Sequence, residues 1–456
     1  MARVVPFRGL LYSTSKVPDL KPVVAPPYDV ISAEKAEEYR ARDAHNIVHV
    51  DLPAGNAAGY ALAAELLAGW RQSGVLTRDE APAVYVCSER YALKGKPERV
   101  RWGFIALVGI EEDDAGIVLP HERTMDLPRI DRLELAAATR MQLSPIFLLY
   151  SDPAGEMSGH IEAVAHRPAD RWVSDDSGTD VRLWRVADAE TIRVVCEGLA
   201  SRKVWIADGH HRYAAARELR NKLRAEQGGG TPGSRSYDYV MAYLTNVDAP
   251  GLSILPYHRI VKGSRKVEAD PLARKLSAHF DVKRFSFEGF HHRAEQIQRR
   301  LHEVSDRGRL AFGLYLGGAE FLLLLLKQDE HTTKLFSDLP EPLKGLDVSI
   351  LQRGILEPVL GITPGAASEG GTLRYSEDIE RAMNWVDAGE AQAAFLLNPT
   401  KKQQLMAVAE AGLQMPPKST YFHPKVLTGL VLNSLDPADE VFRPAGRAEA
   451  ERPAEG

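Results

Sequence analysis

The segment Asp208-Gly209-His210-His211-Arg212 combines residue types that bind and handle phosphate. It follows the apolar run Trp205-Ile206-Ala207 and precedes a helical pattern, so a buried strand should turn through Gly209 into a helix. The first N–H groups of a helix lack partners within the helix and attract anions. Arg212 can bind phosphate oxygens in bidentate fashion, and either histidine can donate to phosphate or relay a proton. We expect a phosphate site here, with His211 catalytic.

Two other interpretations of this segment remain. Asp208 stands at the end of the predicted strand, where it can hold a divalent cation or simply cap the helix. An ordinary strand-to-helix turn would carry the two histidines at its surface. Zinc is disfavoured, because adjacent helical residues diverge by about 100° and no His-Glu-x-x-His spacing or cysteine lies nearby.

A second polar segment, residues 120–124, contains His121, Glu122 and Arg123. A glutamate beside a cation stays ionised and can act as general base toward a hydroxyl group. We expect Glu122 to be that base and His121 to contact substrate. The alternative is a solvated charged loop.

Near the N-terminus, Pro26 and Pro27 precede Tyr28 and Asp29 between a strand and a helix. The prolines restrict the loop and would hold both following side chains at low entropic cost. We expect Tyr28 and Asp29 to contact substrate, with Asp29 as an alternative to Asp208 for holding Mg²⁺. A rigid connector is the competing interpretation.

The loop 415–425 is braced by prolines and carries Lys418, Ser419, Thr420 and Lys425. Two ammonium groups with nearby hydroxyls suit an anionic substrate. Lys418-Ser419-Thr420 resembles the end of a Walker loop, but the Gly-rich run that would cradle phosphates is absent. A basic surface loop is the alternative interpretation.

These segments lie between alternating helices and strands, which predicts the α/β (α+β) class. We expect a phosphate-binding domain over 1–265, a second α/β domain over 266–435 and a disordered tail over 436–456, which is rich in charge, Pro and Ala. Apolar periodicity predicts helices over 59–72, 131–140, 347–356, 377–385 and 402–411, and strands over 84–87, 104–110, 146–150, 205–207, 240–244, 253–255, 310–316 and 321–327. The strands 84–87 and 104–110 should form an antiparallel pair, and Gly317 and Gly318 should join 310–316 and 321–327 in a hairpin. Ser32 can cap the helix that follows it.

Composition limits the partners of this protein. The 57 Lys and Arg residues against 62 Asp and Glu give a net charge of −5, which disfavours nucleic acid as a ligand. The longest bulky apolar run, 321–326, is far shorter than the roughly 20 residues of a membrane-spanning helix. No secretory pattern opens the chain and Cys87 and Cys196 are its two cysteines, so we expect a cytoplasmic protein without a membrane span. A homo-oligomer stays open.

Seven motifs in a fixed order together resemble the family catalogued as domain of unknown function 1015. The resemblance spans about residues 4 to 435. The motifs are Pro26-Pro27-Tyr28-Asp29-Val30, His121-Glu122-x-Thr124, Ser144-Pro145-Ile146-Phe147, Ala207 to Tyr213, Leu255-Pro256-x-His258-Arg259, Leu346-Asp347-Val348 and Met415 to Lys425.

The segment Asp208 to Arg212 is also similar to the phosphate-binding motif of the ParB and sulfiredoxin-like fold, whose members include free serine kinases. This resemblance implies a ParB/sulfiredoxin-like core, with ATP or ADP and Mg²⁺ bound at this segment and a carboxylate elsewhere that takes the substrate hydroxyl proton. The sequence departs from the expected family pattern at Gln142, where Asn is expected, and at Tyr257, where Thr is expected. Both changes can alter the shape of the pocket.

We therefore expect a nucleotide-dependent phosphotransferase, a small-molecule kinase that acts on free serine or a similar hydroxyl metabolite. A phosphoserine phosphatase would use the same anion site with water as acceptor. A non-catalytic ParB-like nucleotide-binding regulator is the alternative from a different class. The expected residues are Asp208, Gly209, His210, His211 and Arg212 for phosphate, Asp208 for metal, Glu122 and His211 for catalysis, and Tyr28, Asp29, His121, Lys418, Ser419, Thr420 and Lys425 for substrate.

Overall fold

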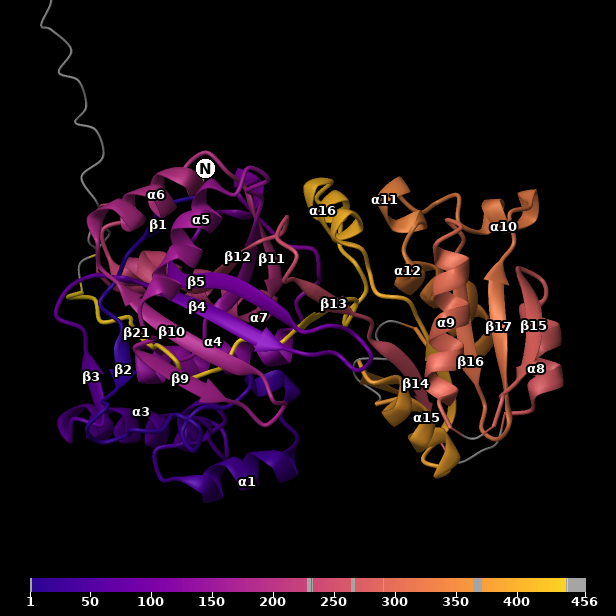
Figure 1. Ribbon diagram of the computed structural model, residues 1–456, viewed down its shortest axis with the longest axis horizontal. Helices are drawn as coiled ribbons and strands as arrows, with labels where there is room; N and C mark the ends of the chain where they lie inside the picture. Colours follow the sequence, from indigo (N-terminus) through magenta and orange to yellow (C-terminus); the bar gives the residue numbers. More distant parts are fainter. Residues whose placement is uncertain are drawn as a thin grey trace, which may run out of the picture. The chain divides into compact units, whose positions relative to one another are not determined.

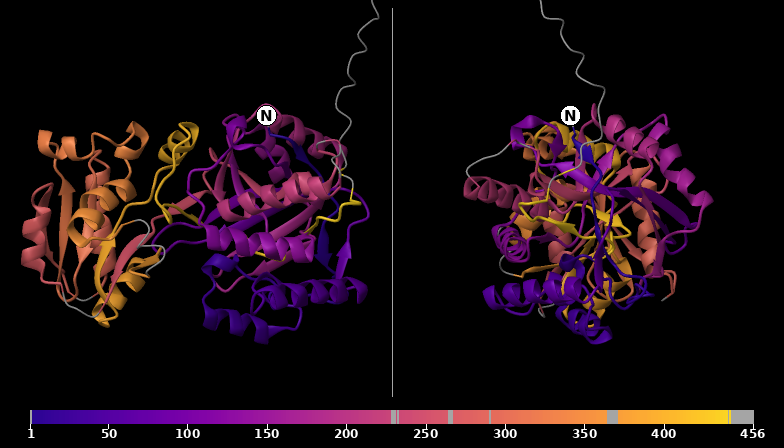
Figure 2. Two further views of the ribbon diagram at one scale, coloured as in Figure 1. Left: turned by 180° about the vertical axis from the view of Figure 1, so that it is seen from behind. Right: turned by 90° about the vertical axis from the view of Figure 1, so that its left-hand side faces the viewer.

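The computed structural model describes residues 2–227, 231, 233–263, 267–289, 291–363, 371–439 and 441. The chain forms two compact units (Figures 1 and 2). The first comprises Met1–Leu119, Thr124–Leu252 and Pro424–Gly456, and the second comprises Pro120–Arg123 and Ser253–His423. Both units mix helices with sheets, which confirms the predicted α/β (α+β) class. The ParB/sulfiredoxin-like character of the first unit stays a prediction.

A mixed sheet of nine strands forms the framework of the first unit, counted over the described residues. Its order is β6-β11-β8-β12-β5-β4-β10-β9, and β1 pairs with β5. The predicted antiparallel pair is confirmed, because Tyr85 of β4 lies opposite Ile105 of β5. The strands are β1 Val4–Val5, β4 Val84–Tyr91, β5 Arg99–Gly109, β6 Val118–Leu119, β8 Ile146–Tyr150, β9 Arg171–Ser174, β10 Asp180–Val186, β11 Val204–Asp208 and β12 Tyr239–Asn246; two small sheets pair β2 Leu10–Tyr12 with β3 Leu76–Arg78, and β7 Met141–Gln142 with β21 Asn433–Ser434.

Apolar spacing explains how helices pack on this sheet. Met157 and Ile161 of α5 and Val195 and Leu199 of α6 recur one turn apart, and they join Leu148 of β8 in one buried core. At the start of α1, the side chain of Ser32 accepts the N–H of Lys35, as a capping residue should. The helices are α1 Ala33–Arg42, α2 Val48–Asp51, α3 Ala57–Gln72, α4 Asp126–Thr139, α5 Glu156–Ala163, α6 Ala189–Leu199 and α7 His210–Glu226, with short η1 Tyr28–Val30, η2 Asp113–Ala115, η3 Val164–His166 and η4 Ser236–Asp238.

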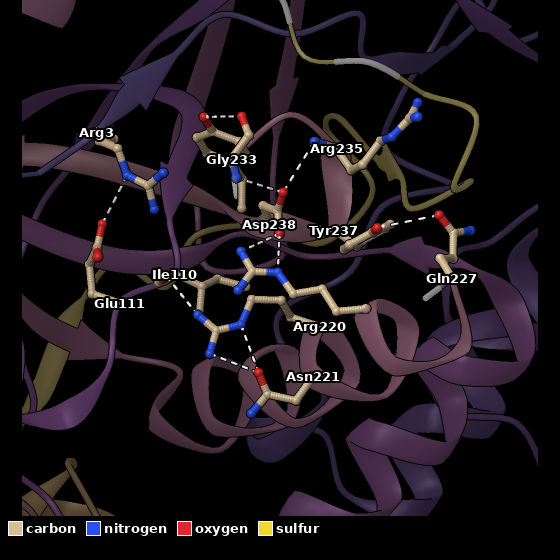
Figure 3. A network of polar contacts seen from close by, with 12 residues as sticks. Arg3, Ile110, Glu111, Arg220, Asn221, Gln227, Gly233, Arg235, Tyr237 and Asp238 are labelled. Carbon is tan, nitrogen blue, oxygen red and sulfur yellow. Dashed lines mark hydrogen bonds and ion pairs between the residues drawn. The ribbon is translucent and has the colours of Figure 1, made fainter. Parts of the chain in front are cut away.

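Two arginines fix the later turns of α7 against the rest of the first unit (Figure 3). Arg220 Nη1 donates to the carbonyl of Ile110 at 2.8 Å. Arg224 Nε donates to the buried carboxylate of Asp238 at 2.7 Å, and the same carboxylate accepts the N–H of Gly233 at 2.8 Å. The direction of α7, and therefore the position of its first turn, is set by these bonds.

The second unit contains an antiparallel sheet in the order β15-β17-β16-β19-β14-β18. The predicted hairpin at Gly317 and Gly318 is confirmed, since β16 pairs with β17 and both glycines have positive φ. Its strands are β13 Ser253–Leu255, β14 His258–Lys262, β15 Phe280–Ser286, β16 Ala311–Tyr315, β17 Glu320–Leu326, β18 Leu373–Ser376, β19 Ala391–Leu396 and β20 Tyr421–His423, and its helices are α8 Ala269–Leu276, α9 Arg293–Ser305, α10 Glu330–Leu335, α11 Glu341–Lys344, α12 Asp347–Leu351, η5 Gln352–Leu356, α13 Glu357–Leu360, α15 Ile379–Asp387 and α16 Lys402–Glu410.

The units do not have the expected bounds 1–265 and 266–435. The division falls after Leu252, because β13 pairs with β20 and β14 pairs with β18 and β19, all in the second unit. Residues 424–435 return to the first unit, where Thr428 pairs with Ala25 and Leu432 pairs with Leu10. Figure 1 shows this return as the yellow β21 within the first unit. The division after Leu252 and the return of 424–435 both depend on backbone pairing between distant segments, which apolar periodicity does not encode.

Two further expectations concern the tail and the membrane. Most of the tail expected over 436–456 lies outside the described residues, and in its described part Asp439 forms an ion pair with Arg78 at 2.7 Å. None of the helices in the described ranges has the length and hydropathy that crossing a bilayer would require.

Candidate phosphate site and its surroundings

The predicted strand, glycine turn and helix are present at residues 204–226. Strand β11 is buried up to Ala207, Gly209 is the N-cap residue, and α7 continues for 17 residues. Asp208 accepts the N–H of Gly209 at 2.8 Å through Oδ1. A helix of this length presents its first backbone N–H groups and the positive end of its dipole at residues 210–212, which favours an anion.

Gly209 is required by both backbone conformation and space. Its φ of 90° lies in the left-handed region, where a side chain is strained. A Cβ at this position would lie 3.0 Å from Ile146 Cγ2 and 3.1 Å from Arg212 Nη2. The turn therefore packs directly against the start of β8.

Arg212 braces the turn. Its Nη1 donates to Ser144 Oγ at 2.9 Å and to the carbonyl of Pro145 at 2.6 Å. The N–H groups of Nη1 are therefore bonded within the protein. Nε is buried and has no hydrogen-bond partner among the described residues. Only the N–H groups of Arg212 that make no bond within the protein can bind phosphate, and this expected role stays a prediction.

Asp208 and Lys425 were expected in separate segments, and the structure brings them together. Lys425 Nζ lies 2.7 Å from Asp208 Oδ2, and the lysine side chain is only 8% exposed. The preceding carbonyl, that of Pro424, accepts a bond from buried Arg101 at 2.8 Å, which helps to place Lys425. Lys425 therefore lies beside the start of α7, where it offsets the negative charge of Asp208.

This pairing bears on the expected metal site. Among the residues that the structure describes, no three His, Cys, Asp or Glu side chains are grouped as metal ligands. Asp208 already faces an ammonium group. Mg²⁺ at Asp208 would therefore depend on phosphate oxygens for its other ligands, as Mg²⁺ sites in phosphoryl-transfer proteins commonly do.

The two histidines of the segment differ in their surroundings. His210 is buried, whereas His211 is half-buried and its Nε2 accepts the N–H of Met125 at 2.9 Å. Since an accepting nitrogen carries no proton, the neutral ring of His211 holds its proton on Nδ1. His211 is thereby oriented by the residue that precedes α4.

A small pocket with a volume of about 60 Å³ opens beside Arg212. Its polar lining includes Asp51, Arg132, Ser144 and Arg212, and its apolar wall comes from α4, α7 and neighbouring strands. Arg132 Nη1 lies 3.1 Å from Asp51 Oδ1. Burial raises the pKa of the Asp51 carboxyl, although both arginines lower it.

Tyr28 belongs to the same surroundings. Its ring lies under the guanidinium of Arg132, with 4.1 Å between Arg132 Cζ and the ring centroid. Asp29 follows it on η1 and is exposed. Sequence reasoning did not select Asp51 or Arg132 as site residues, because an aspartate after an apolar stretch and an arginine within a charged helix give no local indication of burial.

The other predicted site residues lie in the second unit. Buried His121 contacts Thr420, with 3.1 Å between Nε2 and Oγ1. Glu122 pairs with Met415 through a parallel backbone bridge. Lys418 has a φ of 58°, and its Nζ lies 5.4 Å from the ring centroid of Tyr257. The structure thus brings the segments 120–123 and 415–421 together within the second unit, and their role in binding substrate stays a prediction.

Asp347, at the start of α12, gives a pH-dependent prediction. Burial raises the pKa of its carboxyl to about 7 from 3.8, although the N–H of Asn398 opposes the shift. The folded state therefore binds more protons than the unfolded state between about pH 4 and 7, so stability falls as pH rises through that window. Asp347→Asn should be more stable than wild type at pH 8, by roughly 1–3 kcal/mol, and equally stable near pH 4.

Urea unfolding at both pH values measures this difference. Asp306→Asn, a substitution at an exposed position that ends α9, is the control and should behave as wild type. Identical pH profiles for Asp347→Asn and wild type would contradict the assignment.

Comparison with known proteins gives one family and several distant structures. Residues 4–349 match the family described as Protein of unknown function (DUF1015). No curated protein matches the chain. Among solved structures, a free serine kinase in complex with AMP is 16% identical with a TM-score of 0.33, covering 68% of this chain and 85% of that one. A conserved hypothetical protein from Pyrococcus furiosus is 16% identical with a TM-score of 0.32, covering 69% and 90%. SbnI from Staphylococcus aureus, with a C-terminal truncation, is 12% identical with a TM-score of 0.34, covering 71% and 85%.

Proposed function

This chain belongs to the DUF1015 family, as its motifs predict, and we propose that it binds a nucleotide through its phosphates at the start of α7. In this proposal the protein transfers a phosphoryl group from the nucleotide to a small hydroxyl compound. The observation that carries the proposal is the glycine turn at Gly209, which places the first turn of a long helix beside cationic side chains. Free serine is the first acceptor to test, because the motif resemblance implies it.

Three features around Gly209 support phosphate binding. The positive φ of Gly209 turns the chain from β11 directly into α7, and the helix dipole favours negative charge at the start of α7. Arg212, and Lys425 in its ion pair with Asp208, place cationic groups next to the turn. Phosphoryl transfer depends mainly on holding phosphates in line and neutralising their charge, so such a site contributes directly to catalysis.

The adjoining pocket has a volume of about 60 Å³, which is too small to enclose a nucleobase, so the nucleotide in this proposal follows from the motif resemblance. The wall of the pocket contains Leu135, Ala216 and Leu219, whereas Arg212 lies at its polar part. The pocket and the phosphate site thus share Arg212. In this proposal His211 donates or relays a proton near the phosphates, and Glu122 acts as the general base that takes the proton of the acceptor hydroxyl.

The first experiment measures phosphoserine formation from free serine with ATP or ADP and Mg²⁺. We expect wild type to form the product and His211→Ala to lose roughly 10²–10⁴-fold in rate, the usual contribution of a positioned acid or base. His302→Ala, an exposed position on α9, should retain wild-type activity.

Two results would redirect the proposal. Release of inorganic phosphate from phosphoserine without nucleotide would indicate the phosphatase. Equal rates for wild type and His211→Ala would contradict the role of His211.

A further inference from the structure

Arg259, part of a motif that the proposed function does not use, is buried without a counter-ion. It lies on β14 and is 3% exposed. Its Nη1 donates to the carbonyl of Tyr257 at 2.6 Å and its Nη2 to the carbonyl of Pro417 at 3.3 Å. A guanidinium group has five N–H donors, so these bonds use two of them. No carboxylate among the described residues lies within 4.0 Å of Arg259, the limit of a salt bridge.

Most other buried arginines in the described ranges have a carboxylate partner. Arg101 pairs with Glu89, Arg132 with Asp51 and Arg220 with Glu112. Arg171 is the exception, since it donates to the carbonyls of Tyr12 and Val17 alone.

Burial lowers the pKa of Arg259 more than its surroundings restore it. Glu122 raises the pKa of this guanidinium through its charge, and no ion pair joins the two among the described residues. Removing a cation from water is costly unless an anion compensates it. Arg259 is therefore a buried cation that a bound anion would stabilise.

A second cation shares the aromatic surroundings of Arg259. Lys418 Nζ lies 5.4 Å from the ring centroid of Tyr257, the residue whose carbonyl binds Arg259. Arg259 Cζ lies 4.9 Å from the ring centroid of Tyr375, and the two tyrosine rings meet edge to face with centroids 6.3 Å apart. Like charges held around one aromatic group repel each other, and a bound anion would relieve that repulsion.

Lys418 is also held in an unusual backbone conformation. Its φ of 58° is uncommon for a residue with a side chain, and the Arg259 bond to Pro417 fixes the preceding residue. Such strain persists where the surrounding structure enforces it, and it is frequent at ligand-binding positions. The loop thus holds the backbone of Lys418 in place relative to Arg259.

We propose that Arg259, Lys418, Tyr257 and Tyr375 form a second anion-binding site, in the second unit, for the carboxylate or phosphate group of a small molecule. The guanidinium binds the two oxygens of this group, and the ammonium group of Lys418 adds a point charge. The site does not depend on the phosphate site of α7. If the proposed function holds, it binds the carboxylate of the acceptor.

Arginine side-chain NMR tests this site in the full chain. The protein is labelled with ¹⁵N-arginine and titrated with sodium acetate and, separately, with sodium phosphate at constant ionic strength. We expect the Nε–H resonance of Arg259 to shift saturably, whereas that of Arg171, the matched arginine on two backbone carbonyls, should not. Arg259→Lys and Arg171→Lys assign the two resonances.

The outcomes separate the ligands and the two proposals. A response to acetate alone identifies a carboxylate site, a response to phosphate alone identifies a phosphate site, and Lys418→Met should weaken either affinity at least tenfold. If Arg259 responds to neither anion, the second site is overturned, whether or not a nucleotide still binds at α7. Should Arg259→Lys not fold, loss of the saturable shift in Lys418→Met remains the test.

Discussion

Gly209→Val should lose nucleotide binding by at least 100-fold while the protein remains folded. A side chain at this position is strained by the φ of 90° and would contact Ile146 and Arg212, so the turn must move away from the start of α7. Displacing the first backbone N–H groups removes the donors that hold the phosphates. Isothermal titration with ADP and ATP measures the loss, and circular dichroism confirms that the variant is folded.

Gly155→Val is a close control for the strain itself. Gly155 is also an N-cap residue with positive φ, 71°, at the start of α5, but no atom lies within 4 Å of a Cβ placed there. It should lose stability through the strained φ alone and keep its affinity for nucleotide. If both glycine variants bind nucleotide as wild type does, the phosphates do not bind at Gly209.

Arg101→Met should lower the free energy of unfolding by about 3–5 kcal/mol, because it leaves the buried carboxylate of Glu89 without its cation. Arg101 Nε lies 2.6 Å from Glu89 Oε2, and both side chains are 1% exposed. Tyr243 donates to the same carboxylate at 2.8 Å, and the guanidinium of Arg101 lies over the ring of Phe147 at 4.7 Å. Urea unfolding measures the change.

The neighbouring exposed pair provides the matched control. Arg90 and Glu98 lie 3.2 Å apart with side chains 49% and 56% exposed, so Arg90→Met should cost less than about 1 kcal/mol. Replacing Glu89 and Arg101 together by leucine should cost less than Arg101→Met alone, since no unpaired charge remains. An Arg101→Met variant as stable as the Arg90→Met variant would show that the buried pair contributes little.

Arg101 also connects stability with the proposed site. Its Nη2 donates to the carbonyl of Pro424, and the next residue is Lys425, which pairs with Asp208. Loss of Arg101 is therefore expected to reduce the order of the cationic group beside α7 as well as the stability of the sheet.

Local patterns predicted the elements that position the phosphate site. The apolar run before Asp208, the single glycine and the helical spacing of Tyr213, Leu219 and Leu223 were sufficient to predict β11 and α7. The Ser32 cap and the glycine hairpin between β16 and β17 were predicted in the same way. Each of these features depends on residues that are close together in the sequence.

Contacts between distant segments could not be predicted in this way. Asp208 and Lys425 are 217 residues apart, and nothing in either segment specifies the other as partner. The return of 424–435 to the first unit depends on backbone pairing, which any sequence can provide. The burial of Arg259 likewise follows from the fold around it, because an arginine beside a histidine gives no sign of being enclosed.

The measurement that tests the central claim most directly is a titration of the full chain with ADP, followed through the backbone amide resonances of His210, His211 and Arg212 in ¹⁵N-labelled protein. We predict large, saturable shifts of these amides with one affinity, the same affinity that calorimetry gives, and their loss in Gly209→Val. Amides that stay in place while ADP binds elsewhere, or no binding of ADP at all, would contradict the phosphate site on α7.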